Sequence, residues 1–394
     1  MEEHTVKNKK IVLYYVSPML DFQKSNASVF RVLNMCRIFD SGIGYDASVI
    51  GKSTSDDEYM VGGIKCRNLR HGKGLFSKAL FLFTYPFRLL RKIGRLGRPD
   101  VIVTYFMYGL PLFLLMRYCR RNNIKLVCDV VEWYEYAFLE NKLKIPAVHW
   151  TMTRLNRQSD GVIAISRFLE AYYKPFLPTL FVPPVFHGGS LMSENRGDYG
   201  LFDSAYLNLI YAGVSGKKDL LNHVIEGLTV LSRAEKRIRL HIIGATKEKV
   251  ERMYGMHLDS SSVICYGYMT HDQLLPYLLQ ADFSVILRHE DRRYAKAGFS
   301  TKFVESFCCG LPVIANASGD MGCYLKDGYN GYLVEGHGAD EFAAVVKRIV
   351  DGVTSDHYRG EMKQNAVRTF MDNFNANAYT DQIAAYFNSI LKCD

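Results

Sequence analysis

The sequence lacks any arrangement of cysteines that would hold a metal ion or a disulfide framework. Its nine cysteines are an odd number and are scattered, and the only adjacent pair is Cys308–Cys309, inside an expected helix. Zinc sites and disulfide scaffolds place their cysteines in pairs at short, recurring spacings. We therefore expect reduced, buried thiols, as in a cytoplasmic protein, and no metal site.

The sequence also lacks an apolar run long enough to cross a membrane. Residues 11–16, IVLYYV, follow several lysines as in a signal peptide, but the run is short and no clear small-residue cleavage site follows it. Residues 101–116 carry no charge, yet they are shorter than a membrane span and contain Gly109 and Pro111. We expect a strand in the first case, and a strand, a turn and a helix in the second.

Acidic residues are missing from one long segment. Between Glu58 and Asp100 there is no Asp or Glu, whereas ten Lys or Arg lie in the same interval. Residues 75–90, LFSKALFLFTYPFRLL, add many Leu and Phe. Such a helix suits the surface of an anionic membrane, and the alternative is a core helix with one solvated basic face. No nucleic-acid motif accompanies the charge, so we expect no nucleic-acid partner.

The apolar segments that are present predict an α/β protein of two domains. The 394 residues are enough for two cores. In both halves, short apolar strands alternate with helices, as in Rossmann-like layers with a parallel sheet. No G-x-G-x-x-G follows the first strand, which argues against a dehydrogenase. We expect domains over 1–186 and 205–374, a polar linker over 187–200, and a terminal helix over 375–394.

Residues 296–317, KAGFSTKFVESFCCGLPVIANA, carry the strongest functional indication. Ser300 and Thr301 are good helix N-cap residues, whose side chains can accept first-turn N–H groups. A helix start approached through Gly298 can offer N–H groups to an anion. Glu305 lies off the apolar face of this helix. Its carboxylate could bind a ligand hydroxyl, or it could simply be solvated.

This segment resembles the donor-binding segment of retaining glycosyltransferases of family 4. In the bacterial polysaccharide-building members the loop reads Ser-Pro-Thr-Lys before Phe-x-Glu. Here Ser300, Thr301, Lys302, Phe303 and Glu305 match, without the proline. The resemblance implies the GT-B fold, with two Rossmann-like domains facing across a cleft and the terminal helix crossing back to the first domain.

The resemblance also implies an activity. The expected enzyme is a retaining, metal-independent hexosyltransferase that moves a sugar from a nucleotide-diphosphate sugar, a UDP-sugar, to a hydroxyl of a glycan or lipid-linked glycan. It needs no cofactor beyond that co-substrate. The expected partners are the nucleotide sugar, the acceptor and an anionic membrane surface, which places the protein in the cytoplasm on the inner face of the membrane.

The site residues implied by the resemblance fall into three groups. Glu305 would hold the donor ribose, while Lys218, with Lys217 as the fallback, and Arg288 would contact the diphosphate. Asp129 joins Lys218 and Arg288 as a catalytic residue. Asp129, Glu132 and Trp133 follow a strand's carboxyl end and are expected on the acceptor side, although a charged surface loop with a half-buried Trp fits equally. The donor-binding set is Gly213, Lys218, Arg288, Gly298, Ser300, Thr301, Lys302 and Glu305.

Two positions depart from the family pattern. Val214 replaces an arginine after Gly213, where a helix is expected over 219–231. Ala297 replaces the first of two glutamates, so a side-chain contact to the sugar is lost. These departures keep open a catalytically degenerate GT-B binding protein. A UDP-sugar 2-epimerase is a further alternative, but its cluster of acids and histidine is not evident.

Overall fold

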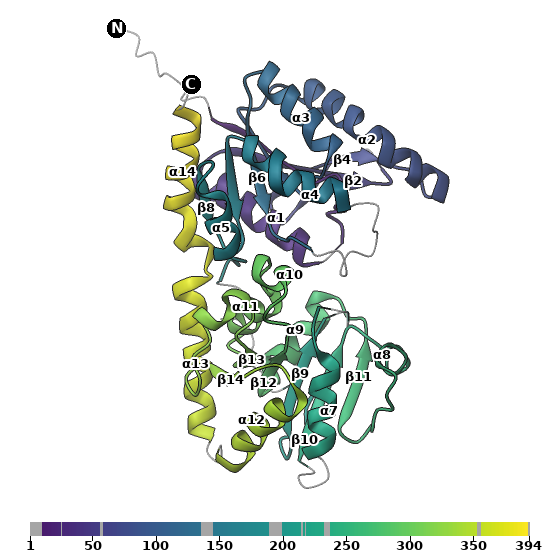
Figure 1. Ribbon diagram of the computed structural model, residues 1–394, viewed down its shortest axis with the longest axis vertical. Coiled ribbons are helices and arrows are strands. Elements are labelled where there is room, and N and C mark those ends of the chain that lie inside the picture. Colours follow the sequence, from purple (N-terminus) through teal and green to yellow (C-terminus); the bar gives the residue numbers. More distant parts are fainter. Residues whose placement is uncertain are drawn as a thin grey trace. The chain divides into compact units, whose positions relative to one another are not determined.

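A computed structural model describes residues 10–24, 26–55, 58–134, 145–188, 199–213, 216, 218–231, 237–352 and 356–392 (Figure 1). The chain divides into two compact units. The first contains Met1–Val131, Leu139–Val182 and Ala376–Asp394, and the second contains Glu132–Phe138 and Pro183–Asn375. The terminal helix thus belongs to the first unit, whereas Glu132, Trp133 and Tyr134 belong to the second.

The first unit is built on an eight-stranded sheet in the order β3-β4-β2-β1-β5-β6-β7-β8. Neighbouring strands are parallel except for β3 and β4, which are antiparallel. The strands are β1 (Val12–Val16), β2 (Asp46–Ser53), β3 (Tyr59–Val61), β4 (Ile64–Arg70), β5 (Val101–Tyr105), β6 (Lys125–Val130), β7 (Gly161–Ala164) and β8 (Thr179–Phe181).

Helices connect the parallel strands of the first unit. Asn26 caps the first of them, its side chain accepting a hydrogen bond from the N–H of Val29. Ser166 caps the fifth, its side chain accepting a hydrogen bond from the N–H of Leu169. The helices are α1 (Ala27–Arg37), α2 (Leu75–Leu96), α3 (Leu110–Arg121), α4 (Ile145–Trp150), α5 (Arg167–Tyr173) and α14 (Thr380–Lys392).

The second unit is built on a six-stranded, fully parallel sheet in the order β11-β10-β9-β12-β13-β14. Its strands are β9 (Leu207–Ala212), β10 (Ile238–Ile243), β11 (Val263–Gly267), β12 (Phe283–Ile286), β13 (Val313–Asn316) and β14 (Gly331–Val334). Its helices are α7 (Leu221–Leu231), α8 (Lys247–Tyr254), α9 (His271–Gln280), α10 (Arg293–Ala297), α11 (Thr301–Cys308), α12 (Ala339–Gly352) and α13 (Asp356–Asn373).

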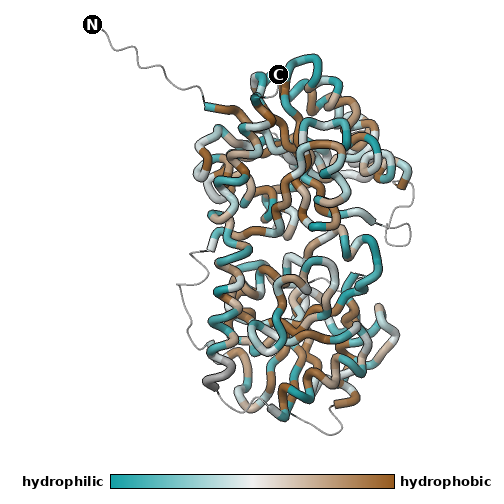
Figure 2. The backbone as a smooth tube through the Cα atoms, turned by 60° about the vertical axis from the view of Figure 1, so that its left-hand side comes forward, coloured by the Kyte–Doolittle hydropathy of each residue, from teal (hydrophilic) through white to brown (hydrophobic). Residues whose placement is uncertain are grey.

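Both sheets form the cores of their units. Every residue of β5, β7, β9, β12 and β13 is buried, as expected for parallel strands covered on both faces. Figure 2 shows hydrophobic stretches of the chain, in brown, running through the interior of each unit. The predicted α/β class with two Rossmann-like domains is therefore confirmed.

The cysteines and the longest apolar helices bear on the expected thiols and on the membrane. Among the described residues every cysteine is a free thiol, and only Cys323 is exposed. No helix in the described part of the chain is both long enough and apolar enough to cross a membrane.

The strand order of the second unit marks a point where a ligand can bind. From β9 the chain passes through α7 to β10 on one side, whereas from β12 it passes through α10 and α11 to β13 on the other. The two connections leave the sheet in opposite directions, so the loops after β9 and β12 separate at their carboxyl ends. Open α/β sheets bind ligands at such a switch point. Gly213 follows β9 and Arg288 follows β12.

Candidate functional site

Asp219 gathers the charged side chains of this switch point. One carboxylate oxygen accepts hydrogen bonds from the Lys302 ammonium and, at 2.8 Å, from the Tyr211 hydroxyl. The other oxygen lies 3.4 Å from Nε of Arg288. Asp219 and Arg288 also form an isolated backbone bridge. This bridge places Asp219 before α7, which begins at Leu221 rather than at 219 as predicted.

The two cations of this cluster outweigh its single acid. Burial opposes ionisation of Asp219, but the charges of Lys302 and Arg288 together lower its pKa to about 2. The carboxylate is therefore charged at neutral pH, and the three groups carry a net positive charge. Among the described residues, Nε of Arg288 is buried and has no hydrogen-bond acceptor.

Gly213 makes room for the Lys302 side chain. A Cβ at position 213 would lie 2.3 Å from Cε and 2.7 Å from Nζ of Lys302. The residue also has a φ of +152°, a backbone conformation that favours glycine. Lys302 Nζ reaches past it to the Tyr211 hydroxyl at 2.9 Å. The glycine predicted to face the donor is thus the residue that lets the lysine enter the cluster.

The start of α11 leaves its first N–H groups without a side-chain cap. Ser300 is the N-cap residue, as predicted, but its side chain makes no capping hydrogen bond, so that part of the expectation is wrong. No acidic residue lies in the first turn. Gly298 and Ser300 are buried, and Thr301 is half-buried. A helix start of this kind can accept an anion.

Glu305 has a partner that the sequence did not indicate. Its Oε1 lies 3.0 Å from Nε2 of His271, the first residue of α9. The hydrogen bond to Glu305 raises the pKa of His271, although burial acts in the opposite direction. Both side chains are partly accessible. Glu305 is therefore oriented by a histidine, as a ligand-binding carboxylate needs to be, rather than freely solvated.

Lys218 lies beside the segment that was predicted to face the acceptor. Its Nζ donates to Oε1 of Glu132 at 2.7 Å and to the hydroxyl of Tyr134, and it lies over the Tyr134 ring. The guanidinium of Arg293 lies 4.9 Å from the ring centre of Trp133. Within the second unit, Glu132 therefore contacts Lys218 and Trp133 contacts Arg293, two cations that flank the switch point.

Asp129, in the first unit, is buried in an ion pair. Arg31 contacts both of its oxygens, at 2.7 and 2.9 Å, and the Tyr15 hydroxyl donates to it as well. The Asp129 side chain has no accessible surface. Asp129 is therefore part of a buried ion pair that joins β1, α1 and β6. Because its carboxylate is fully used in these contacts, the structure gives no geometric support for its predicted catalytic role.

The structure places one of the two positions that depart from the family pattern, and it adds two residues to the candidate site. Ala297 is fully buried in α10, so a glutamate there would have to displace packed neighbours. Val214 and Lys217 lie outside the described residues. Asp219 and His271 belong to the candidate site but were not predicted. The acid directly after two lysines was the only local indication of Asp219, and His271 offered none.

Comparisons with known proteins identify the class. The family model described as glycosyl transferase 4-like domain matches residues 30–178, and the model described as glycosyl transferases group 1 matches residues 196–368. The two models together account for most of the chain. The chain belongs to the family 4-like glycosyltransferases with the GT-B fold.

Individual relatives are distant. The D-inositol 3-phosphate glycosyltransferase of Acidothermus cellulolyticus is 28% identical over 134 residues, which are 33% of this chain and 28% of that protein. The GDP-mannose-dependent alpha-(1-6)-phosphatidylinositol monomannoside mannosyltransferase of Mycolicibacterium smegmatis is 23% identical over 64% of this chain and 68% of its own. The chain thus spans less than a third of the first relative.

Solved structures share the fold over nearly the whole chain. Sucrose-phosphate synthase from Thermosynechococcus elongatus has a TM-score of 0.76 at 16% identity, covering 98% of this chain and 100% of its own. Anabaena HepE in complex with UDP-glucose has a TM-score of 0.67 at 14% identity, covering 96% and 100%. At these identities the likeness defines the GT-B fold and nothing finer.

Proposed function

We propose that this protein transfers a hexose from a nucleotide-diphosphate sugar, with uridine as the base, to a hydroxyl of a glycan or lipid-linked glycan. One observation carries the proposal: Lys302 and Arg288 share the single carboxylate of Asp219 at the switch point of the second unit. The excess positive charge there is matched by a diphosphate. The α11 N-terminus adds uncapped N–H groups on the same connection.

In this proposal the cations act on the leaving group. Cleavage of the bond between sugar and diphosphate leaves negative charge on the phosphate oxygens, and fixed positive groups stabilise that charge in the transition state. Arg288 can donate paired N–H groups to phosphate oxygens, and Lys302 adds a point charge. Lys218 supplies a third cation once the ligand draws it from Glu132. With three cations present, we propose that no metal ion is required.

Glu305 is the proposed ribose ligand. A carboxylate accepts hydrogen bonds from both vicinal hydroxyls of a ribose, and His271 holds one of its oxygens in place. The names of two similar proteins give the base mixed support, because HepE was solved with UDP-glucose and the mannosyltransferase depends on GDP-mannose. A panel of UDP- and GDP-sugars therefore belongs in the first experiment.

The stereochemical outcome is part of the same proposal. We infer retention of the anomeric configuration, although Ala297 stands where the family pattern has a glutamate. Backbone N–H groups at the start of α11, near Ser300, then take over the contact to the sugar, because the N–H of Gly298 already donates to the carbonyl of Tyr294. NMR of the product from an α-linked donor checks this inference: an α-linkage supports it, and a β-linkage contradicts it.

The acceptor side of the proposal includes a membrane. Helix α2 is basic and exposes several large apolar side chains, among them Phe76 at 84% and Phe83 at 79%. A helix of this composition can lie in the interface of an anionic bilayer, where lipid-linked acceptors are found. We therefore propose a cytoplasmic enzyme at the inner face of the membrane.

The experiment is a thermal-shift and turnover screen of the pure protein against nucleotide sugars. A ligand that binds only the folded state raises its melting temperature. A UDP-sugar that stabilises the protein and is turned over with a glycan acceptor supports the proposal. Stabilisation without turnover in the presence of membrane extracts would instead favour a catalytically degenerate binding protein.

A further inference from the structure

Helix α2 has apolar side chains on two opposite faces. One face packs on the first unit, where Phe81, Tyr85, Leu89 and Ile93 are buried. The other is an exposed stripe in which side chains follow at intervals of four, three and four residues, a spacing that lines up along a helix. The stripe consists of Phe76, Leu80, Phe83 and Phe87, which are 84%, 52%, 79% and 63% exposed.

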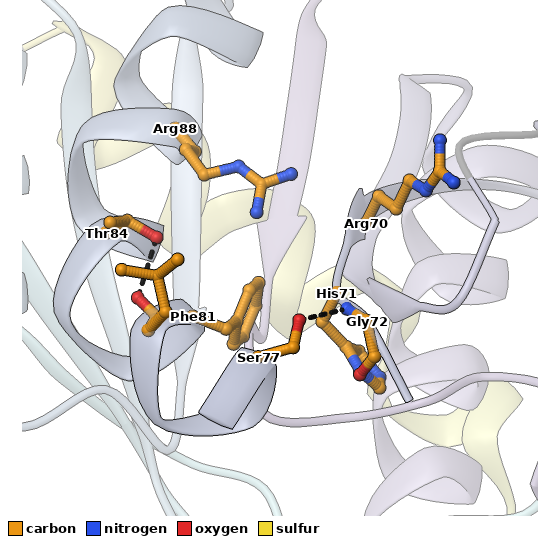
Figure 3. Close-up of a pocket in the computed structure, with 8 residues that line it drawn as sticks. Arg70, His71, Gly72, Ser77, Phe81, Thr84 and Arg88 are labelled. Carbon is orange, nitrogen blue, oxygen red and sulfur yellow. Dashed lines mark hydrogen bonds between the residues drawn. The ribbon is translucent and has the colours of Figure 1, made fainter. Parts of the chain in front are cut away.

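A basic pocket opens beside this stripe. Its volume is about 210 Å³, many times the roughly 10–15 Å³ of such space that one water molecule needs. Arg70, the last residue of β4, and His71, which follows it, line one side of the pocket, and α2 contributes Arg88 and Leu80. Figure 3 shows Arg88 extending from α2 across the pocket toward the segment that carries Arg70. Leu80 belongs both to the pocket lining and to the exposed stripe.

The charge of this pocket is not balanced from its own part of the chain. No acidic residue occurs between Glu58 and Asp100, and Glu58 itself pairs with Arg67. The guanidinium of Arg88 lies 5.8 Å from the ring centre of Phe81, an arrangement that leaves its N–H edge for an acceptor. The pocket walls are held by a hydrogen bond from the N–H of Gly72 to Oγ of Ser77, 2.9 Å long.

We propose that this pocket binds the phosphate of an anionic lipid headgroup while the stripe enters the acyl region next to it. Two guanidinium groups are suited to a phosphate through paired hydrogen bonds. The inference rests on the proposed membrane surface of α2 and deepens it, because it turns general charge attraction into a defined headgroup site. It does not involve the donor site of the second unit.

The neighbouring stripe selects a lipid over a soluble phosphate ester. A phosphate bound between Arg70 and Arg88 would place its attached chain near Leu80, at the edge of four exposed apolar side chains. A soluble phosphate ester would leave those side chains in water. Burying them in the bilayer contributes to binding in proportion to their apolar area.

The test is co-sedimentation with phosphatidylcholine vesicles that contain either phosphatidic acid or phosphatidylglycerol, matched for surface charge. The pocket variant combines Arg70→Ser with Arg88→Ser. Its control combines Arg91→Ser with Arg95→Ser, which removes the same charge from exposed positions of α2 outside the pocket. Wild-type protein should prefer phosphatidic acid, whose monoester offers more oxygens to the two guanidinium groups.

The pocket variant should lose about tenfold more binding to phosphatidic acid than the control, and it should lose the preference between the two lipids. Equal losses in the two variants would overturn the headgroup site. Full displacement from vesicles by glycerol 3-phosphate at equal phosphate concentration would overturn the choice of a lipid as occupant.

A stripe variant, Phe83→Ser with Phe87→Ser, distinguishes the headgroup site from the more general proposal that α2 binds an anionic membrane. It should release the protein from every anionic vesicle. If the stripe variant is released while the pocket variant binds as its control does, the membrane proposal is supported and the headgroup site is contradicted. If the stripe variant stays bound to the vesicles, both the membrane proposal and the headgroup site are contradicted. Turnover of a nucleotide sugar with a soluble acceptor should be unchanged in all three variants, which confirms that they are folded.

Discussion

Replacing Asp219 by asparagine removes the negative charge that Lys302 and Arg288 share, with little change in size. Asparagine keeps one oxygen that can accept from Lys302 or Tyr211, but the two cations are left without a counter-charge. Leaving buried charges uncompensated is strongly destabilising, by about 3–5 kcal/mol where the charge is fully buried. Because the cluster retains some access to solvent, we expect the lower end of that range for Asp219→Asn at neutral pH.

The pH dependence of this effect follows from the pKa of Asp219. It is lowered from 3.8 to about 2 because the charges of Lys302 and Arg288 outweigh the effect of burial. A folded-state pKa below the unfolded value contributes stability above the unfolded pKa, and this contribution is lost as pH falls through the folded pKa. The difference between a pKa of 3.8 and one of about 2 corresponds to roughly 2–3 kcal/mol at neutral pH, most of which is lost by pH 2. The wild type should therefore lose about 2 kcal/mol between about pH 5 and pH 2 that the asparagine variant does not lose.

The assay is urea unfolding of both proteins over this pH range, followed by circular dichroism. The difference in unfolding free energy between wild type and variant should shrink toward pH 2. UDP should also stabilise the variant more than the wild type, because only the ligand then neutralises the two cations. Parallel stability curves across the whole range, or a loss of stabilisation by UDP, would refute the cluster as described.

The remaining predictions concern the same unit. Arg288→Ala and Lys218→Ala should weaken binding of UDP more than binding of UMP, since both residues are proposed to act on the diphosphate; calorimetry measures both ligands. Glu305→Ala should weaken nucleotide binding by on the order of 1.5–3 kcal/mol for each charge-assisted hydrogen bond to ribose, again by calorimetry, while it loses no more stability than His271→Gln does through their shared pair. Gly213→Ala should displace the ammonium of Lys302 and lower affinity for UDP, with a smaller effect on UMP. Because Glu305 raises the pKa of His271, their pair stabilises the fold most below about pH 6.5 and less as pH rises through the folded pKa. His271→Gln should therefore cost more stability at about pH 6 than at about pH 9, measured by urea unfolding.

Each of these predictions has an outcome that contradicts it. Equal losses of UMP and UDP affinity in the Arg288 variant would remove that residue from the diphosphate. Unchanged nucleotide affinity in the Glu305 variant would end the ribose assignment. A Gly213 variant that binds UDP as the wild type does would mean that Lys302 is not a ligand. A pH-independent cost for His271→Gln would mean that the histidine is not charged beside Glu305.

The fold could be predicted from sequence because its determinants are local. Buried strands such as Val12–Val16 are short apolar runs, and the start of α11 is marked by Ser300. The boundaries depended on contacts with distant residues and were less certain. Asp219 was placed in a helix on the basis of its neighbours, but its bridge to Arg288 holds it outside α7.

The sequence indicated individual residues of the candidate site, but not the contacts between them. Lys302, Arg288 and Glu305 were indicated by a short segment and a strand end. Their partners lie far away in sequence: 83 residues separate Lys302 from Asp219, and His271 comes from another connection. No local pattern encodes such pairs. Helix α2 is a similar case, because the sequence left a choice between a core helix and a membrane helix, whereas the structure gives it one buried and one exposed apolar face.

Calorimetric titration of the wild-type protein with UDP and UMP tests the central claim most directly. If the cations around Asp219 form a diphosphate site, UDP should bind at least tenfold more tightly than UMP, the equivalent of about 1.4 kcal/mol for the second phosphate. Equal affinities, or no binding of either nucleotide or of GDP, would contradict the assignment of the second unit as the donor-binding half of a glycosyltransferase.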